Sequence, residues 1–387
     1  FHSYETAYIY QERGNSAPLV RPALDHPPLF ALIPGFFHLL SGQNTYDLPS
    51  QVAIRLPMVL IGTFNVFLFA LLAYRLTDKK TAFLVSLFFA SSPLVVASSR
   101  LVVADNLLAT LVLLVALLFT LKKQNLFLLM FLSAAAILTK IQGAFLGAGL
   151  ALYFFAEKKY QSVAMILAAM FLAGGVFALY GAFFNWDLFM AIFAEQSSRA
   201  IGLTTLLHRF FFYPSLAAEI WPTAEKSILF VVTIGVVIYQ SQVKFFRLLG
   251  AIFLAFLVVA VVAFDETNIN GWYEYALLPI LFICTIPVVK FILENLHKTA
   301  IWLLWLLFAL PLLKMWAVNL GQLEPFTPLT RKFLPLVGGI VYLPFSKTWQ
   351  KVITWGFLLV IIGLQLVVNW TLSSQSYNHQ LYLLGRY

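Results

Sequence analysis

The sequence predicts an all-α fold, a polytopic transmembrane helix bundle with interfacial helices on its outer face. Two observations support this prediction. First, 61% of the 387 residues are hydrophobic and only 11% are charged, which is more apolar surface than a soluble protein of this size needs to bury. Second, the apolar residues form long continuous runs, whereas the strands of a membrane barrel alternate over segments of about ten residues. Continuous runs satisfy their backbone hydrogen bonds in lipid as helices.

Apolar runs that approach the ~20 residues needed to cross the hydrocarbon follow one another along the chain. Twelve are expected as spans: 56–75, 81–98, 106–121, 125–139, 143–157, 162–183, 226–242, 247–264, 273–289, 299–318, 333–346 and 350–371. The run 333–346 is the weakest, because it is short and is bounded by Pro335 and Pro344.

Lysine and arginine predict the orientation, because they collect in cytoplasmic loops. With segment 1–55 outside, the inner loops carry 13 basic and three acidic residues, and the outer face carries 12 basic and 13 acidic residues. The net charge of +9 is therefore an insertion signal. It is not a nucleic-acid footprint, since no compact basic patch with interleaved aromatics lies outside the membrane. We expect one helix before Phe1, thirteen in all, although a cleaved signal peptide would explain the same start.

The spans divide the chain into five parts. Residues 1–55 are expected to form an outer loop with interfacial helices and catalytic motifs, and 56–183 the transmembrane helices of a catalytic core. Residues 184–225 form a second outer loop with an amphipathic segment, 226–371 the C-terminal transmembrane helices, and 372–387 an outer tail. Loops as long as 1–55 and 184–225 usually carry function.

Ionisable residues gather at the outer ends of the spans. They are Glu5, Asp25, His26, Arg55, Arg100, Asp105, Lys140, Glu195, Arg199, His208, Arg209, Asp265, Glu266 and Glu274. A transporter or proton relay needs such groups near the bilayer midplane, where this chain has almost none. The pattern therefore places any chemistry at the outer interface. A nucleotide-dependent mechanism is not supported, because no glycine-rich phosphate loop occurs.

Five motifs occur in a characteristic order. They are DHPPLF at 25–30, RLPMVLIG at 55–62, SSRLVVADNLL at 98–108, LTKIQG at 138–143 and AEQSSRAIGLTTLLHRFFFYP at 194–214. Together they resemble the polyprenyl-phosphate-sugar-dependent glycosyltransferases of the membrane C superfamily. Within it, the lipid A aminoarabinose transferases and the protein O-mannosyltransferases are most similar. The similarity covers residues 1–290.

The resemblance implies a glycosyltransferase of the plasma membrane with its active site on the extracytoplasmic face. Such an enzyme moves a sugar from an undecaprenyl- or dolichyl-phosphate carrier to an acceptor hydroxyl with inversion. The reaction needs a carboxylate for the acceptor proton and positive charge or a metal for the departing phosphate. The implied partners are the polyprenyl-phosphate sugar, membrane lipids and an acceptor that is a lipid, a glycan or a protein, with no nucleic acid and no nucleotide.

Glu5 and Asp105 are the catalytic carboxylates that the resemblance implies. The family opens its first outer loop with an Asp-Glu pair, but here Tyr4 stands where the aspartate would be. Three readings follow: Glu5 is the base, Asp105 takes that role, or the activity differs or is weaker. Two structural readings also stay open, in which Glu5 caps a short interfacial helix and Asp105 forms a rim ion pair with Arg100.

The resemblance also implies a metal site and a phosphate site. Asp25 and His208 would hold a divalent metal, zinc, magnesium or manganese, since carboxylate and imidazole are normal zinc ligands. His26, Lys140, Arg199, Arg209 and Tyr273 would bind the donor phosphate, and Arg55 and Arg100 would have structural or orienting roles. Alternatively, Asp25 caps the helix that begins at Pro27 and Pro28, the cations snorkel to lipid headgroups, and Tyr273 belongs to an interfacial aromatic belt.

Two other functions compete with glycosyl transfer. A lipid-carrier flippase or transporter would use the same outer groove but predicts charges deeper in the bundle. A catalytically inactive relative that acts as an assembly partner is compatible with Tyr4. The sequence identifies neither the sugar nor the acceptor.

Overall fold

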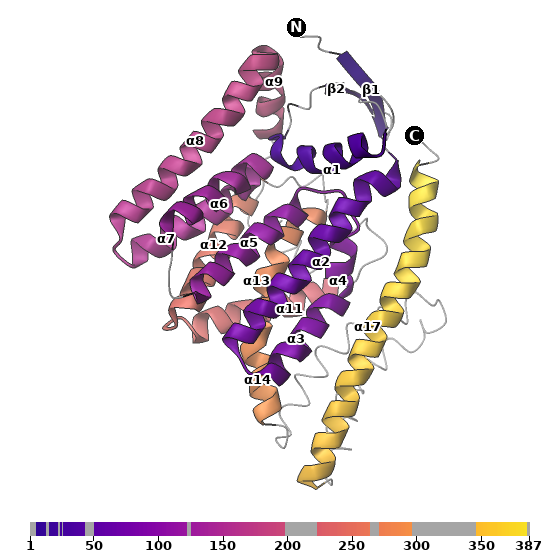
Figure 1. Cartoon of the computed structure of the whole chain (residues 1–387), viewed down its shortest axis with the longest axis vertical. Helices are drawn as coiled ribbons and strands as arrows, with labels where there is room; N and C mark the ends of the chain where they lie inside the picture. The colour runs from indigo at the N-terminus through magenta and orange to yellow at the C-terminus, as the bar shows by residue number, and fades with distance from the viewer. Residues whose placement is uncertain are drawn as a thin grey trace. The chain divides into compact units, whose positions relative to one another are not determined.

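The computed structural model describes residues 5–12, 15–21, 24, 26–42, 50–121, 125–197, 223–263, 271–295 and 346–384. In these ranges the chain is helical apart from one two-stranded sheet (Figure 1). It divides into two compact units. The first contains residues 1–61, 102–206 and 240–269, and the second contains residues 62–101, 207–239 and 270–387.

The first unit is a helical bundle preceded by a hairpin. Its elements are β1 (Glu5–Glu12), β2 (Asn15–Arg21), α1 (Leu29–Leu40), the start of α2 (Gln51–Leu76), α5 (Asp105–Thr120), α6 (Leu126–Thr139), the 3-10 helix η1 (Ile141–Gly143), α7 (Ala144–Ala156), α8 (Tyr160–Phe184), α9 (Trp186–Ser197) and α12 (Lys244–Ala263). Helix α7 packs against α6, α8 and α12, and α5 packs against α6 and α12. These contacts bury the predominantly apolar faces of α5 and α7.

The second unit is built around α3 and the segment that follows residue 270. Its elements are the remainder of α2, α3 (Lys79–Ser91), α4 (Pro93–Ser98), α11 (Thr223–Tyr239), the 3-10 helix η2 (Gly271–Leu277), α13 (Leu278–Ile283), α14 (Thr285–Glu294) and α17 (Lys347–Leu384). Helix α3 contacts α14 and α17, and α11 contacts α13 and α14. Phe89 anchors this core, with its ring centroid 4.3 Å from that of Phe69 and 5.2 Å from that of Phe282.

Ten of the twelve expected spans coincide with helical segments, and the other two, 299–318 and 333–346, lie outside the described residues except for Ser346. Within the described ranges, five helices are long and apolar enough to cross a membrane: Val52–Leu76, Tyr160–Phe184, Lys244–Val261, Glu274–Glu294 and Lys347–Val367. Shorter apolar helices in the same ranges are Leu29–Leu40, Asp105–Thr120, Leu126–Thr139, Ile141–Ala156 and Ile228–Tyr239. The chain is a multi-pass membrane protein, and on α8 Phe171 and Leu172 expose 80% and 71% of their surface, as expected for side chains that face lipid.

The expected span 81–98 is not a single helix. The run 81–98 is divided into α3 and α4 at Ser92, whose backbone is extended, with φ −60° and ψ 128°. Pro93 follows and opens α4. Proline has no backbone N–H to continue the hydrogen bonds of α3 and disfavours a helical residue before it, so the helix stops and restarts.

Residues 1–55, expected to form an outer loop with interfacial helices, also contain two strands that the sequence analysis did not predict. Residues 5–21 form an antiparallel hairpin in which Glu5 pairs with Arg21 and Glu12 with Asn15, with an irregularity between Thr6 and Tyr8. The segment TAYIY in β1 is rich in β-branched and aromatic residues, which favour strands. Glu5 therefore begins a strand and does not cap a helix. Helix α1 is the helical part of this region.

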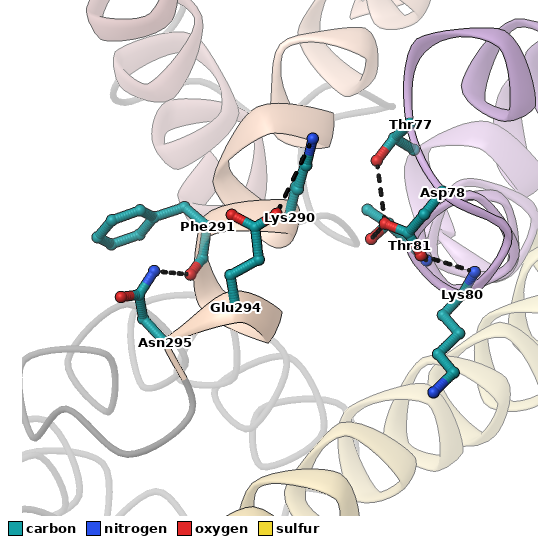
Figure 2. Close-up of polar contacts among 8 residues, drawn as sticks. All are labelled: Thr77, Asp78, Lys80, Thr81, Lys290, Phe291, Glu294 and Asn295. Atoms are coloured by element: carbon teal, nitrogen blue, oxygen red, sulfur yellow. Dashed lines mark hydrogen bonds and ion pairs between the residues drawn. The ribbon is translucent and has the colours of Figure 1, made fainter.

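Asp78 fixes the start of α3. Its side chain accepts hydrogen bonds from the backbone N–H groups of Lys80 and Thr81 at 3.0 and 3.1 Å, and the Thr81 hydroxyl donates a third at 2.6 Å (Figure 2). These contacts satisfy donors that a helix leaves unpaired at its first turn. They lower the pKa of Asp78 from 3.8 to about 2, with the Thr81 hydroxyl as the largest cause.

Candidate functional site

The predicted site residues Asp105 and Lys140 form a buried ion pair in the first unit. Lys140 Nζ lies 2.7 Å from Asp105 Oδ2, and each side chain is 3% exposed. The two residues are 35 positions apart in the sequence. The structure therefore brings together a predicted catalytic carboxylate and a predicted phosphate ligand.

The two helices that carry this pair favour its charges. Asp105 is the first residue of α5, and Lys140 directly follows the last residue of α6, against which α5 packs. A helix carries partial positive charge at its N-terminus and partial negative charge at its C-terminus. The carboxylate and the ammonium each sit at the helix end that stabilises their charge.

A sharp turn between α6 and α7 sets the position of Lys140. The Lys140 backbone is extended, with φ −164° and ψ 139°, and its carbonyl accepts a hydrogen bond from Gly143 N at 2.7 Å. A Cβ atom on Gly143 would lie 2.1 Å from the carbonyl oxygen of Ala136. Only glycine fits there, which gives a physical reason for the spacing of Lys140 and Gly143 in the LTKIQG motif.

Because Asp105 and Lys140 are buried, each of their charges depends on the other as its partner. Removing two charges from water costs several kcal/mol per ion, and the pair recovers that cost only in good geometry. A lone carboxylate or ammonium at this depth would be strongly unfavourable. Asp105 therefore holds the Lys140 ammonium in one place, and Lys140 does the same for the carboxylate.

For several of the other predicted site residues, the structure describes only the backbone or does not describe the residue. Glu5 is the first residue of β1 and Tyr273 belongs to η2, but their side chains lie outside the described part. His26 is exposed, and Arg55 on α2 and Arg100 after α4 are half-buried. Asp25, Arg199, His208 and Arg209 lie outside the described residues, so the predicted roles of these four stay predictions.

Leu24 anchors the chain where the DHPPLF motif begins. It is 2% exposed and packs with Phe177 of α8 and Phe189 of α9. The rings of Phe177 and Phe189 meet edge to face at 5.1 Å. This apolar cluster holds the residue before the DHPPLF motif against α8 and α9.

Sequence reasoning missed a second buried ion pair, in the second unit. Lys226 Nζ lies 2.7 Å from Glu274 Oε2, and the side chains are 1% and 3% exposed. Glu274 was among the expected outer ionisable residues, but Lys226 was not. The signal was present, since Lys226 is an ionisable residue at the outer end of the expected span 226–242.

Ion pairs join the ends of helices as the predicted loop alternation requires. In the first unit Asp105 and Lys140 come from predicted outer ends, and Glu157 and Arg247, joined at 2.6 Å, come from predicted inner ends. In the second unit the start of α3 and the end of α14, both predicted to be inner, lie in one region (Figure 2). The sidedness inferred from lysine and arginine is thus consistent within each unit.

The metal prediction rests on Asp25 and His208, which the described ranges do not include. Within those ranges, no three histidine, cysteine, aspartate or glutamate residues lie together in a way that could hold a metal ion. The divalent metal therefore stays a prediction.

Comparison with known families supports the motif analysis. Residues 25–186 match the family model of the dolichyl-phosphate-mannose-protein mannosyltransferases. The resemblance to polyprenyl-phosphate-sugar-dependent glycosyltransferases is confirmed. The matched region includes Asp105 and Lys140, together with the helices that carry them. A comparison with curated proteins finds no match.

A solved structure has a similar fold. The chain is similar to ArnT from Cupriavidus metallidurans bound to undecaprenyl phosphate, with a TM-score of 0.56, 13% identity and coverage of 90% of this chain. The chain spans 66% of the length of that ArnT chain. The apo form of the same ArnT aligns with a TM-score of 0.48 and 14% identity, over 89% of this chain and 67% of that one.

Proposed function

We propose that the protein transfers a sugar from a polyprenyl-phosphate carrier to an acceptor hydroxyl at the extracytoplasmic face of the plasma membrane, with inversion at the anomeric carbon. The observation that carries the proposal is the buried Asp105–Lys140 pair at the meeting of α5 and α6, within the region that matches the mannosyltransferase family model. The fold shared with an ArnT that binds undecaprenyl phosphate supports this carrier class.

Lys140 is suited to the carrier phosphate. Its ammonium is a compact charge with three donors, of which Asp105 Oδ2 accepts one. A carrier phosphate at the membrane interface would meet the ammonium already oriented. Preorganised positive charge stabilises the leaving group most effectively where water is excluded, which agrees with the burial of both side chains.

The ion pair with Lys140 suggests different roles for the two carboxylates, Asp105 and Glu5. Asp105 is engaged with Lys140, so it fits best as the group that orients the phosphate ligand. Glu5 then takes the role of general base for the acceptor hydroxyl. In the reaction the acceptor oxygen forms a bond to the anomeric carbon, the bond from that carbon to the phosphate oxygen breaks, Glu5 receives the acceptor proton, and the polyprenyl phosphate leaves as the free carrier.

The distribution of buried charge favours this function over transport. In the described residues, the buried Asp, Glu, Lys and Arg side chains are those of Asp105, Lys140, Lys226 and Glu274. Asp105, Lys140 and Lys226 lie at or near the end of a helix, and Glu274 is the first residue of the apolar span Glu274–Glu294. A flippase that carries a phosphate across the bilayer would need polar groups along the route.

Binding of undecaprenyl phosphate to the purified, detergent-solubilised protein tests the carrier. We expect saturable binding by native mass spectrometry, with undecaprenol, which lacks the phosphate, bound at least tenfold more weakly. The paired variant Asp105→Asn with Lys140→Gln should remove this preference, whereas Lys290→Gln on α14 should keep it. Equal binding of undecaprenol and undecaprenyl phosphate by the wild-type protein would refute the proposal.

Turnover tests the chemistry. Purified protein incubated with undecaprenyl-phosphate sugars and bacterial envelope acceptors should release undecaprenyl phosphate and form a glycosylated product with inverted anomeric configuration by NMR. Glu5→Gln should lower this release by at least 100-fold without changing carrier binding. Undiminished release by Glu5→Gln would exclude Glu5 as the base.

A further inference from the structure

A basic cluster lies at the end of α7 opposite to Lys140. Its members are Lys158 and Lys159, in the turn between α7 and α8, and Lys244 and Arg247, in the first turn of α12. All of them belong to the first unit. Helix α7 has 13 residues, which is a length of about 20 Å, so the cluster is separate from the candidate functional site.

Helix packing joins the two halves of this cluster around one carboxylate, that of Glu157. Arg247 Nη1 donates a hydrogen bond to Glu157 Oε1 at 2.6 Å, and Lys244 Nζ lies 3.8 Å from Glu157 Oε2. The guanidinium also donates to the backbone carbonyls of Ser241 and Gln242. Two lysines directly follow Glu157 in the sequence. Four basic side chains therefore stand against one carboxylate, which leaves the cluster strongly positive.

Lys158 has a backbone conformation that is unusual for lysine. Its φ is 57°, in the left-handed region that glycine usually occupies after a helix. The backbone N–H groups of Lys158 and Lys159 donate to the carbonyls of Phe155 and Phe154, each at 2.9 Å, which closes the end of α7. Glycine would form this turn with less strain, so the turn alone does not account for a lysine at position 158.

Exposed apolar side chains border the cluster on α7 and α8. Leu152 is 43% exposed, and Phe155 and Tyr160 are each 61% exposed. The rings of Phe155 and Tyr160 meet edge to face at 5.9 Å. Aromatic side chains beside basic ones are typical of the boundary between hydrocarbon and water. The cluster therefore has an apolar surface on its membrane side.

Membrane insertion by itself does not require this arrangement. Lysine and arginine in separate loops are enough to orient the helices. Insertion gives no reason for the loops before α8 and α12 to converge on Glu157, nor for a lysine in the left-handed conformation. A negatively charged partner at this surface accounts for both features.

We propose that Lys158, Lys159, Lys244 and Arg247 bind the headgroup of an anionic phospholipid, with its acyl chains along the exposed apolar side chains of α7 and α8. Basic clusters directly at the end of a transmembrane helix attract anionic headgroups, and lysine provides compact charges for a phosphate. A zwitterionic phospholipid has the same chains but no net charge, so the excess of positive charge predicts a preference between the two. The inference does not rest on the proposed function.

Native mass spectrometry of the delipidated full-length protein in neutral detergent tests this preference. We expect the wild-type protein to bind phosphatidylglycerol about tenfold more tightly than phosphatidylcholine. The difference should shrink at high salt, which screens attraction between exposed charges.

The diagnostic variant is Lys158→Gly with Lys159→Gln. It removes two charges of the cluster, while glycine relieves the backbone strain at position 158, so its apparent melting temperature in lipid-free detergent should not fall. Its preference for phosphatidylglycerol should fall by about fivefold or more, because each basic residue near a membrane surface adds attraction of that order. The matched control, Lys79→Gln with Lys80→Gln, removes two exposed neighbouring lysines at the start of α3 and should keep the wild-type preference.

Four results would overturn the inference. Equal binding of the two phospholipids by the wild-type protein would show that the cluster has no anionic partner of this class. An unchanged preference in the diagnostic variant would place the lipid elsewhere. An equal loss in the Lys79 and Lys80 control would mean that total charge, and not this cluster, sets the preference. Undecaprenyl phosphate that displaces phosphatidylglycerol from the wild-type protein, and binds the diagnostic variant more weakly, would assign the cluster to the carrier.

Discussion

The ammonium of Lys140 and the carboxylate of Asp105 are in contact at 2.7 Å between the end of α6 and the start of α5, and both side chains are buried. Each charge lies at the helix end that favours it, and each is the partner that makes burial of the other tolerable. This mutual dependence makes the pair a unit, whose members are expected to respond together to substitution.

Single substitutions at this pair should cost more than removal of both charges. We expect Lys140→Met to destabilise the protein by about 3–5 kcal/mol, because Asp105 is then a buried charge without this partner. Adding Asp105→Asn should recover much of that loss. Apparent melting temperatures from fluorescence-detected size exclusion measure the effect. Additive losses in the double variant would mean that the two groups act independently.

The close packing of α7 against α12 predicts a sensitive glycine. A Cβ atom on Gly149 would lie 2.4 Å from Ile252 Cα, a backbone atom that cannot rotate away. Gly149→Ala should therefore destabilise the protein by about 1–3 kcal/mol, as overpacking does. Gly174→Ala on α8 is the matched control, since no atom lies within 4 Å of its added Cβ. The control should be neutral or slightly stabilising in thermal unfolding.

The cap of α3 predicts a modest dependence on acid. The pKa of Asp78 is about 2 in the folded protein, below its ordinary value of 3.8. A depressed folded pKa means that the stabilisation is fully present above about pH 3.8 and is lost as the pH falls through 2. We expect Asp78→Ala to lower stability by about 1 kcal/mol near neutral pH, and this difference should shrink in melting curves between pH 4 and pH 2. Lys79→Ala, an exposed neighbour, should show no such trend.

Polar contacts inside the second unit predict a specific docking of α17 on α3. The Ser91 hydroxyl lies 2.5 Å from Gln365 Oε1, and Asn369 Nδ2 donates to the Ser91 carbonyl at 2.6 Å. A double-mutant cycle of Ser91→Ala and Gln365→Leu should give a coupling of about 0.6–1.7 kcal/mol, the range for hydrogen bonds between membrane helices. Leu366→Ala at the exposed neighbour should show no coupling to Ser91→Ala.

The sequence alone determined the helical character of the chain and predicted which helix ends share a side of the membrane, because both follow from local physics. A helix in lipid needs a long apolar run, and lysine and arginine mark its inner end. The expected runs therefore coincide with helices throughout the described ranges, and Lys140 and Asp105 were found by their place at the outer ends of such runs. The sequence analysis predicted the local backbone conformation less accurately. The strand-forming residues of β1 and the proline break at Pro93 both departed from the helical expectation, because an apolar run does not by itself specify its backbone.

Only the tertiary structure decided which charges meet. From the sequence, Asp105 had a rim contact with Arg100 as one possible role, and the packing of α5 on α6 places Lys140 against it. The same is true of Lys226 and Glu274, which lie on separate elements brought together by the folding of α11 against the segment after residue 270. Helix packing decides which distant residues become partners. In the low dielectric of the interior, separating such a pair would leave each charge unpaired at a high cost in free energy.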